Sequence, residues 1–165
     1  MSSPLRSSSS NSIKIGISEM VVSKDIDAQV ITYALGSCIG LVLYDPKKKC
    51  AGMLHYQLPS SKGKPDVNPF MYADTGVPKL FQKMYKQGCK KENIIVKVAG
   101  GANINDANGI FDIGKRNYLI LRKMLWKNDV LITSEEVGGN IPRTLSIEIA
   151  SGLCWVQTGR DVTEL

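Results

Sequence analysis

The feature that most constrains the fold is a pair of short apolar runs separated by one tight polar segment. Residues 39–45 (IGLVLYD) and 50–58 (CAGMLHYQL) flank the sequence PKKK, in which Pro46 suits a tight turn. Short runs rich in β-branched and aromatic residues are typical of strands. The pattern therefore predicts a β-hairpin in the first half of the chain.

Further runs extend this pattern and add two helices. Residues 74–88 and 114–128 carry apolar side chains at helical spacing, and Gly88 is a suitable helix stop. The order of elements predicts an α+β fold of mostly antiparallel sheet with two long helices. The other strands are predicted at residues 13–19, 28–35, 93–99 and 129–137, with a closing hairpin at 143–158.

Length and composition suit one domain with a polar tail. Of the 165 residues, 43% are hydrophobic and 22% charged, which allows a real core. Residues 1–12 are expected to be a disordered serine-rich tail, because they lack the apolar segment of a signal peptide. Residues 13–165 then form the domain. No apolar run reaches the roughly 18 residues that span a bilayer, so a cytoplasmic protein without membrane insertion is predicted.

The net charge of +6 raises the question of an acidic partner. The basic residues are scattered, and their densest groups, within residues 45–50 and 89–93, stand at expected turns. A solvated surface explains them more simply than a nucleic-acid-binding stripe, so no nucleic-acid partner is predicted. An acidic protein surface stays open as a partner.

The four cysteines show no metal-binding or disulfide pattern. No pair has C-x-x-C spacing, and the chain has one histidine, so no metal site is predicted. A cytoplasmic location also argues against disulfides. Cys50, Cys89 and Cys154 are most simply small apolar core residues.

Cys38 differs because it follows a break between two strands. Gly36 permits the backbone angles that such a break needs. A break between strands exposes a side chain and leaves nearby N–H groups without a partner in the sheet. A nucleophile beside an oxyanion hole requires both features. The hairpin return brings His55 toward Cys38, where an imidazole would favour the thiolate. Thr32 on the preceding strand can accept the ring N–H through its hydroxyl or its carbonyl. From spacing alone, ordinary packing within strands explains all three residues as well.

Two glycine-rich segments, VAGGANI (98–104) and EEVGGNIPR (135–143), invite a phosphate-binding interpretation. Neither contains G-x-G-x-x-G or the P-loop pattern, so no nucleotide cofactor is predicted. A third segment, FDIGKRN (111–117), places Lys115 and Arg116 at a helix start, where the helix dipole disfavours cations. This unfavourable placement hints that the surface at this helix start has a role other than stabilising the helix.

These segments, together with ALGSCIGLVLYDPKKKCAGMLHYQLP, resemble the CheD family of chemoreceptor glutamine deamidases over roughly residues 13–158. The resemblance implies a chemotaxis enzyme that hydrolyses receptor glutamine side chains to glutamate and ammonia through a cysteine thioester. It implies no cofactor, and receptor glutamyl methylesterase activity as a side reaction. The implied fold is like the catalytic domain of the cytotoxic necrotizing factor toxins. It is a β-sandwich-like core of mostly antiparallel or mixed sheet, flanked by two long helices, in three to four layers.

The resemblance also implies residue roles. Cys38 is the nucleophile, His55 the general base, and Thr32 completes a Cys-His-Thr triad. Asn103 stands near a place where the family has a bulky apolar residue, so the substrate contact there is left open. The residues expected to form the oxyanion hole or to bind substrate are Gly36, Ser37, Gly100, Gly101, Phe111 and Asn117.

The implied partners are the cytoplasmic domains of chemoreceptors and CheC, a phosphatase of the response regulator CheY. CheC would occupy the receptor-binding face, for which residues 111–117 are the candidates. The alternative function is a non-catalytic adaptor that binds CheC or receptor and tunes signalling. The presence of Thr32, Cys38 and His55 together favours the enzyme, because a purely binding protein does not need all three.

Overall fold

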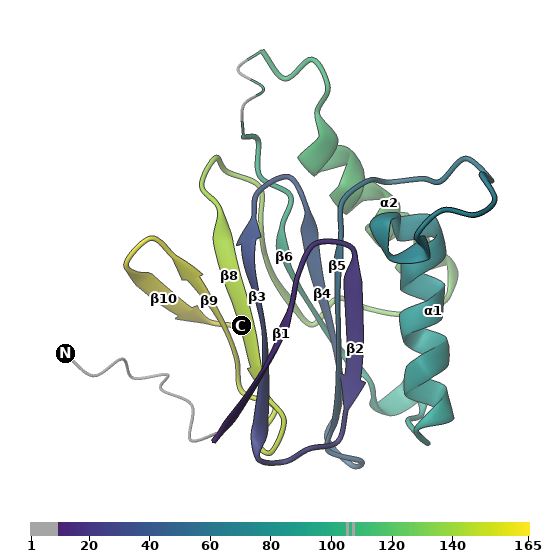
Figure 1. Cartoon of the computed structure of the whole chain (residues 1–165), viewed down its shortest axis with the longest axis vertical. Coiled ribbons are helices and arrows are strands. Elements are labelled where there is room, and N and C mark those ends of the chain that lie inside the picture. The colour runs from purple at the N-terminus through teal and green to yellow at the C-terminus, as the bar shows by residue number, and fades with distance from the viewer. Residues whose placement is uncertain (1–9, 105, 107) are drawn as a thin grey trace.

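The computed structural model describes residues 10–104, 106 and 108–165, and within them two five-stranded sheets pack face to face (Figure 1). Sheet A has the strand order β1-β3-β8-β9-β10, and sheet B the order β2-β5-β4-β6-β7. Helices α1 (Ala73–Lys86) and α2 (Ile113–Lys127) cover the outer face of sheet B, which gives three layers. The strands are β1 (Asn11–Ile15), β2 (Glu19–Ser23), β3 (Ala28–Leu35), β4 (Ile39–Asp45), β5 (Cys50–Tyr56), β6 (Ile95–Gly100), β7 (Ser134–Val137), β8 (Arg143–Glu148), β9 (Cys154–Thr158) and β10 (Asp161–Glu164).

The predicted α+β class is confirmed. β4 and β5 form the expected antiparallel hairpin, β8 and β9 form the closing one, and both predicted helices are present. Both sheets are mixed, because β1 pairs with β3 and β6 pairs with β7 in parallel, whereas the other neighbours are antiparallel. Short 3-10 helices at Pro69–Met71 and Lys91–Asn93 complete the connections around α1.

The prediction of one strand over residues 13–19 is wrong. The chain leaves β1 after Ile15, turns through residues 16–18 and enters the other sheet as β2. Ser18 adopts φ 62°, a left-handed conformation that interrupts a strand. One alternating run therefore supplies a strand to each sheet.

Strand limits differ from prediction at both ends of the chain. β1 begins at Asn11, so the sheet includes the last two residues of the expected tail, whereas residues 1–9 lie outside the described residues. β7 covers only the last four residues of the predicted 129–137 strand. β10 was not predicted, because its four residues, Asp161–Glu164, carry little apolar pattern.

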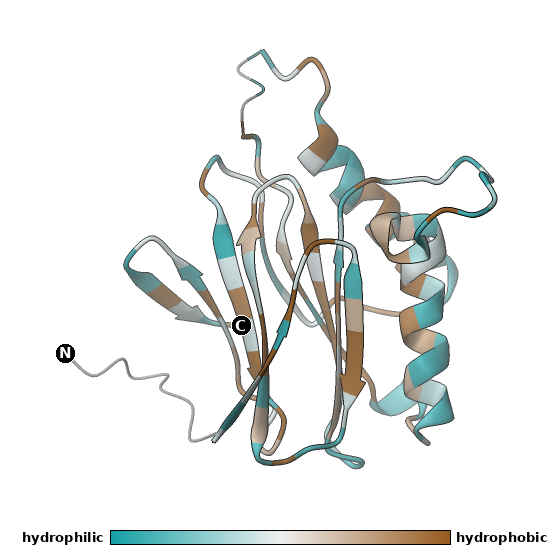
Figure 2. Ribbon diagram, in the orientation of Figure 1, coloured by the Kyte–Doolittle hydropathy of each residue, from teal (hydrophilic) through white to brown (hydrophobic). Residues whose placement is uncertain are grey.

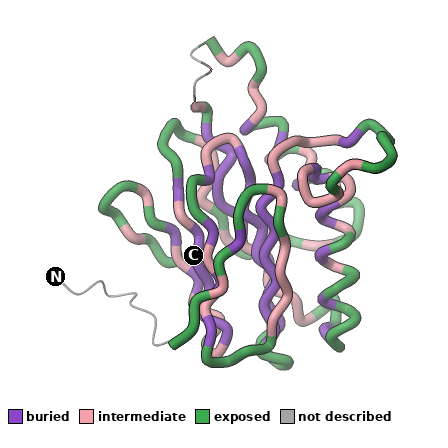
Figure 3. Tube along the Cα trace, in the orientation of Figure 1, coloured by how far each residue is buried: buried purple, intermediate pink, exposed green. Residues whose placement is uncertain are grey.

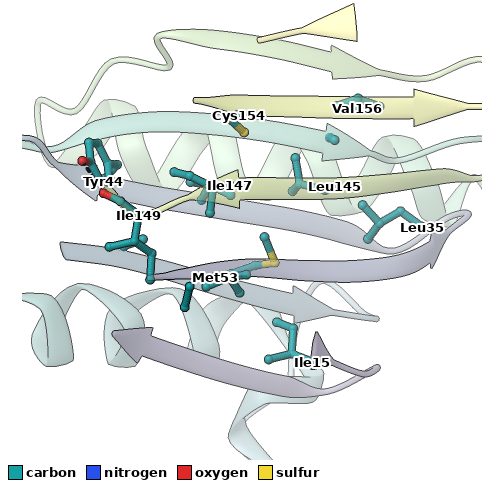
Figure 4. Packing of buried hydrophobic residues seen from close by; sticks show 14 of the residues in the cluster. Ile15, Leu35, Tyr44, Met53, Leu145, Ile147, Ile149, Cys154 and Val156 are labelled. Carbon is teal, nitrogen blue, oxygen red and sulfur yellow. Dashed lines mark hydrogen bonds between the residues drawn. The ribbon is translucent and has the colours of Figure 1, made fainter. Parts of the chain in front are cut away.

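The first core fills the space between the sheets (Figure 4). Inward-facing residues of β3, β4, β5, β8 and β9 alternate with residues that face the other way, as expected where two sheets pack. The phenol of Tyr44 donates a hydrogen bond across this layer to the carbonyl of Ile149, at 2.7 Å. The two sheets are thus joined by apolar packing and by a satisfied polar contact.

The second core lies between sheet B and the helices. α1 contributes Val77, Leu80 and Met84, and α2 contributes Leu121 and Leu125. Figure 2 shows apolar and polar segments alternating along both helices, as expected of helices with one buried face. Because sheet B is covered on both sides, every residue of β4 and β5 is buried, and these strands form the purple centre of Figure 3.

Among the described residues, no helix combines the length and the apolar character needed to cross a bilayer.

Candidate active site

Cys38 and His55 lie on the same side of sheet B, at the end of the space between the sheets. On β4, alternate residues face the first core, and the row through Val42 and Gly40 leads to Cys38. Gly40 stands directly opposite His55 on β5. Cys38 is therefore a diagonal neighbour of His55, and such pairs have Cα atoms about 7–8 Å apart. The predicted return of the hairpin is what brings these two residues together.

Thr32 reaches the same place from sheet A. It follows Val30 in the inward-facing row of β3, immediately before an irregularity in the pairing with β8. Ala34, within that irregularity, adopts φ 57°. Bulges of this kind re-aim side chains and are frequent beside active sites. Of the three residues implied by the family resemblance, Thr32 thus comes from β3 of sheet A, His55 from β5 of sheet B, and Cys38 from the loop between β3 and β4.

The Thr32 hydroxyl determines which nitrogen of His55 carries the proton. It donates to the carbonyl of Ile15 at 2.9 Å, and it lies 2.7 Å from His55 Nδ1. Because the hydroxyl proton is committed to Ile15, the oxygen is left to accept, so Nδ1 must be the protonated nitrogen. Of the two acceptors predicted for Thr32, the structure uses the hydroxyl rather than the backbone carbonyl.

His55 Nε2 is then an unprotonated, basic nitrogen. It is fully buried and has no hydrogen-bond partner among the described residues. Burial lowers the pKa of His55 from 6.5 to about 4, and the negative charge of Glu19 opposes this effect. The imidazole is therefore neutral at pH 7 and ready to accept a proton.

Cys38 is also neutral in the free protein. Its side chain is 8% exposed, and burial raises the pKa of the thiol above its usual value, partly offset by a hydrogen bond from its own backbone N–H. Burial therefore acts against the thiolate that the sequence analysis expected, and the effect of the imidazole on the thiol stays a prediction. A thiol beside a neutral imidazole can act as a nucleophile only if its proton is transferred as it reacts.

The backbone around Cys38 contains two groups of N–H donors. The N–H of Gly36 donates to Ala34 at 3.0 Å, and that of Gly101 donates to Cys38 at 2.9 Å, so both are already used. The N–H groups of Ser37 and Cys38 have no carbonyl acceptor among the described residues. The N–H groups of Ser37 and Cys38 are therefore the donors closest to the thiol that an oxyanion could use, although that of Cys38 also interacts with its own sulfur.

Gly100 has a steric role. It has φ 110°, and a Cβ atom built on it would lie 2.2 Å from the carbonyl oxygen of Cys38. A side chain at this position would force the Cys38 backbone to move. Gly100 therefore allows β6 to support the nucleophile loop from behind.

Asn117, which the sequence analysis assigned to substrate binding, is instead fully buried. Its side-chain nitrogen donates to the carbonyls of Ser37 and Gln57, both at 2.9 Å, and its backbone carbonyl accepts from the phenol of Tyr56 at 2.7 Å. Ser37 adjoins Cys38, and Gln57 stands two residues after His55. Asn117 thus connects α2 to both halves of the site and holds them in register.

A cleft of about 410 Å³ opens beside the nucleophile loop. Ser37, Gly101, Asn103 and Phe111 are among its lining residues, and Phe111 is 68% exposed. Cys38 is not among them, so the cleft leads to the loop from the Ser37 side. The cleft is wide enough for a side chain of a larger partner to enter.

Sequence reasoning missed two contributors to the site. The carbonyl of Ile15 acts through the backbone, which leaves no signal in side-chain patterns. Arg143 is buried and donates to the carbonyls of Gly100 and Gly138, which supports the strand behind Cys38. A buried arginine at the start of a strand is unusual and was available as a signal.

Cys50, Cys89 and Cys154 are buried, which confirms their prediction as core residues, and Cys50 and Cys89 hydrogen-bond each other. Within the described ranges, no three His, Cys, Asp or Glu side chains gather closely enough to hold a metal ion.

Comparison with known proteins agrees with the resemblance seen in the sequence. The family model described as CheD chemotactic sensory transduction matches residues 57–158. A protein of Solibacter usitatus named probable chemoreceptor glutamine deamidase CheD is 47% identical over 156 residues, covering 93% of this chain and 92% of that protein. A Syntrophus aciditrophicus protein named probable chemoreceptor glutamine deamidase CheD 1 is 47% identical over 147 residues, covering 87% of this chain and 92% of that protein. The chain therefore belongs to the CheD family.

Proposed function

We propose that this protein deamidates specific glutamine side chains of chemoreceptors to glutamate. The names of its relatives support the substrate, and the hydrogen bond between Thr32 and His55 is the observation that carries the chemistry. That bond leaves Nε2 as the unprotonated nitrogen of an imidazole whose strand register makes it a diagonal neighbour of Cys38. A thiol beside a correctly oriented base is the arrangement that nucleophilic catalysis at a carboxamide requires.

Acylation begins when His55 Nε2 takes the proton of the Cys38 thiol as the sulfur attacks the carboxamide carbon. The carbonyl oxygen becomes negative, and the N–H groups of Ser37 and Cys38 are the donors placed to stabilise it. The imidazolium then returns the proton to the nitrogen, and ammonia leaves. Because burial lowers the pKa of His55 to about 4, its imidazolium is a strong acid, which favours this step.

Deacylation repeats the sequence with water. His55 takes a proton from a water molecule, which attacks the thioester of Cys38, and the tetrahedral intermediate collapses to a glutamate side chain and the free thiol. The same acyl-enzyme would form from a glutamyl methyl ester with release of methanol. Methylesterase activity on receptors is thus a side reaction that this mechanism permits.

The family resemblance also supports finer expectations. These are a cytoplasmic location, CheC as a partner, and a fold related to the cytotoxic necrotizing factor catalytic domains. Within residues 111–117, Asn117 is buried, so the exposed side chains of Phe111, Lys115 and Arg116 are the candidate surface for receptor or CheC.

Incubation of a receptor cytoplasmic fragment with the protein tests the proposal, with ammonia release and mass spectrometry of the glutamines as readouts. Cys38→Ala and His55→Ala should abolish conversion, whereas Cys89→Ala, which changes a cysteine in the other core, should retain it. If Cys38→Ala converts receptor glutamines at the normal rate, the assignment is wrong. If no variant or wild-type protein converts them but all bind receptor, the adaptor function is the better account.

A further inference from the structure

Glu19 stands directly opposite His55 in the antiparallel pairing of β2 with β5. Residues that face one another in this way project to the same side of the sheet, with Cβ atoms about 4.5–5.5 Å apart. Val21, two residues further along β2, packs against the first core. Glu19 is therefore at the end of the row of β2 that faces the first core, at the edge of the sandwich, where it is exposed to solvent.

The β1–β2 turn fixes the Glu19 carboxylate. The backbone N–H of Gly16 donates to Glu19 Oε2 at 3.1 Å, and the N–H of Ser18 donates to the carbonyl of His55 at 2.8 Å. The preceding residue, Ile15, accepts the Thr32 hydroxyl. The β1–β2 turn is thus connected to His55 in three ways: by the hydrogen bond from Ser18, by the Thr32 hydroxyl bonded to Ile15, and by Glu19 opposite the imidazole.

The surroundings of His55 contain few charged groups. β2 presents Glu19, β3 presents the neutral Thr32, and the β3–β4 loop presents the Cys38 thiol. Tyr56 belongs to the second core, and burial raises the pKa of its phenol well above the usual value, so it is neutral. Glu19 is the one charged group whose field is found to raise the pKa of His55 among the described residues.

We propose that Glu19 is a positioning residue of the reaction, whose carboxylate stabilises the imidazolium that forms when His55 takes the proton of Cys38. This inference rests on the proposed deamidase function, in which the imidazolium exists only during turnover. The resting imidazole is neutral, so the attraction grows when the proton moves. An interaction that strengthens in this way lowers the barrier instead of merely tightening binding.

Glu19→Gln isolates the charge, because a glutamine carbonyl can still accept the Gly16 N–H. The chain has one histidine, so NMR titration of the imidazole needs no assignment. In the variant, the His55 midpoint should fall by about 0.5 pH unit, and the difference should shrink at high salt. Glu92→Gln, a charge removal on an exposed 3-10 helix, serves as the matched control and should leave the midpoint unchanged.

Receptor deamidation supplies the second readout. Glu19→Gln should lower kcat about threefold with KM unchanged, and Glu19→Asp should restore most of the rate. An unchanged His55 midpoint in Glu19→Gln would overturn the proposal, as would a normal kcat. If the midpoint falls but the wild-type protein deamidates no receptor, the proposed function fails while the coupling between Glu19 and His55 stands.

Discussion

Replacement of Thr32 by valine removes the hydroxyl that orients His55 while it keeps the shape of the side chain. Thr32 is fully buried, and its hydroxyl donates to Ile15 and accepts from His55. Valine can do neither, so the carbonyl of Ile15 and the ring N–H are both left buried without a partner. Thr32→Ser keeps the hydroxyl and loses one methyl group, which makes it the matched control.

The two variants should differ in both stability and rate. A buried polar group left unpaired costs about 1–3 kcal/mol, so Thr32→Val should lose about 2–4 kcal/mol of unfolding free energy. Thr32→Ser should lose about 1 kcal/mol, the value of one buried methyl. Loss of a hydrogen bond of about 1.4 kcal/mol changes the ratio of the two ring tautomers by about tenfold. The deamidation rate of Thr32→Val should fall by at least about the same factor.

Nitrogen-15 NMR of the single histidine reads the tautomer directly, at a pH where the ring is neutral. Wild type and Thr32→Ser should show a protonated Nδ1 and an unprotonated Nε2, whereas Thr32→Val should show a mixture. Urea denaturation measures stability, and ammonia release from receptor measures the rate. A Thr32→Val protein that keeps both the wild-type tautomer and the wild-type rate would refute the idea that the hydroxyl orients the base.

Three other predictions concern stability and backbone support. Gly100→Ala should reduce the rate of deamidation at least about tenfold, because the added Cβ atom would displace the carbonyl of Cys38. The control is Gly159→Ala, at φ 61° with open space around it, which should cost only about 1 kcal/mol of stability. Asn117→Ala should lose about 2 kcal/mol or more of unfolding free energy in urea, since two buried carbonyls lose their donor; a value near zero would contradict the connecting role. His55 should make the protein less stable in mild acid. The pKa of His55 is about 4 in the folded protein and 6.5 in the unfolded chain, so the unfolded chain binds the proton first as the pH falls. The unfolding free energy should therefore fall by about 3 kcal/mol between pH 6.5 and pH 4. His55→Gln should lack this component, and identical pH profiles for the two proteins would count against it.

Local sequence pattern was enough for most of the elements. The hairpin of β4 and β5 was predictable because two apolar runs flank a four-residue turn, and α1 because its apolar residues repeat at helical spacing. The prediction of one strand over residues 13–19 was wrong, because the alternation of apolar and polar residues continues through a turn that takes the chain from one sheet to the other. Alternation reports which side of a strand a residue faces, but not which sheet the strand joins.

The identity of Cys38 and His55 as candidates also came from sequence, through the strand break, the hairpin return and the family resemblance. What those residues can do was decided by the tertiary structure. Burial makes both neutral, a state that no spacing reveals. Burial therefore opposes the thiolate that the sequence analysis expected.

Sequence by itself determined the composition of strands and helices and the residue types at the site, because these depend on neighbours a few positions apart. Only the tertiary structure placed Thr32 against His55, Asn117 against Ser37, and Glu19 opposite the imidazole. Each of these contacts depends on strand register or helix packing between segments far apart in the chain. Register is set by the fit of whole sheets and cores, which no local window of sequence contains.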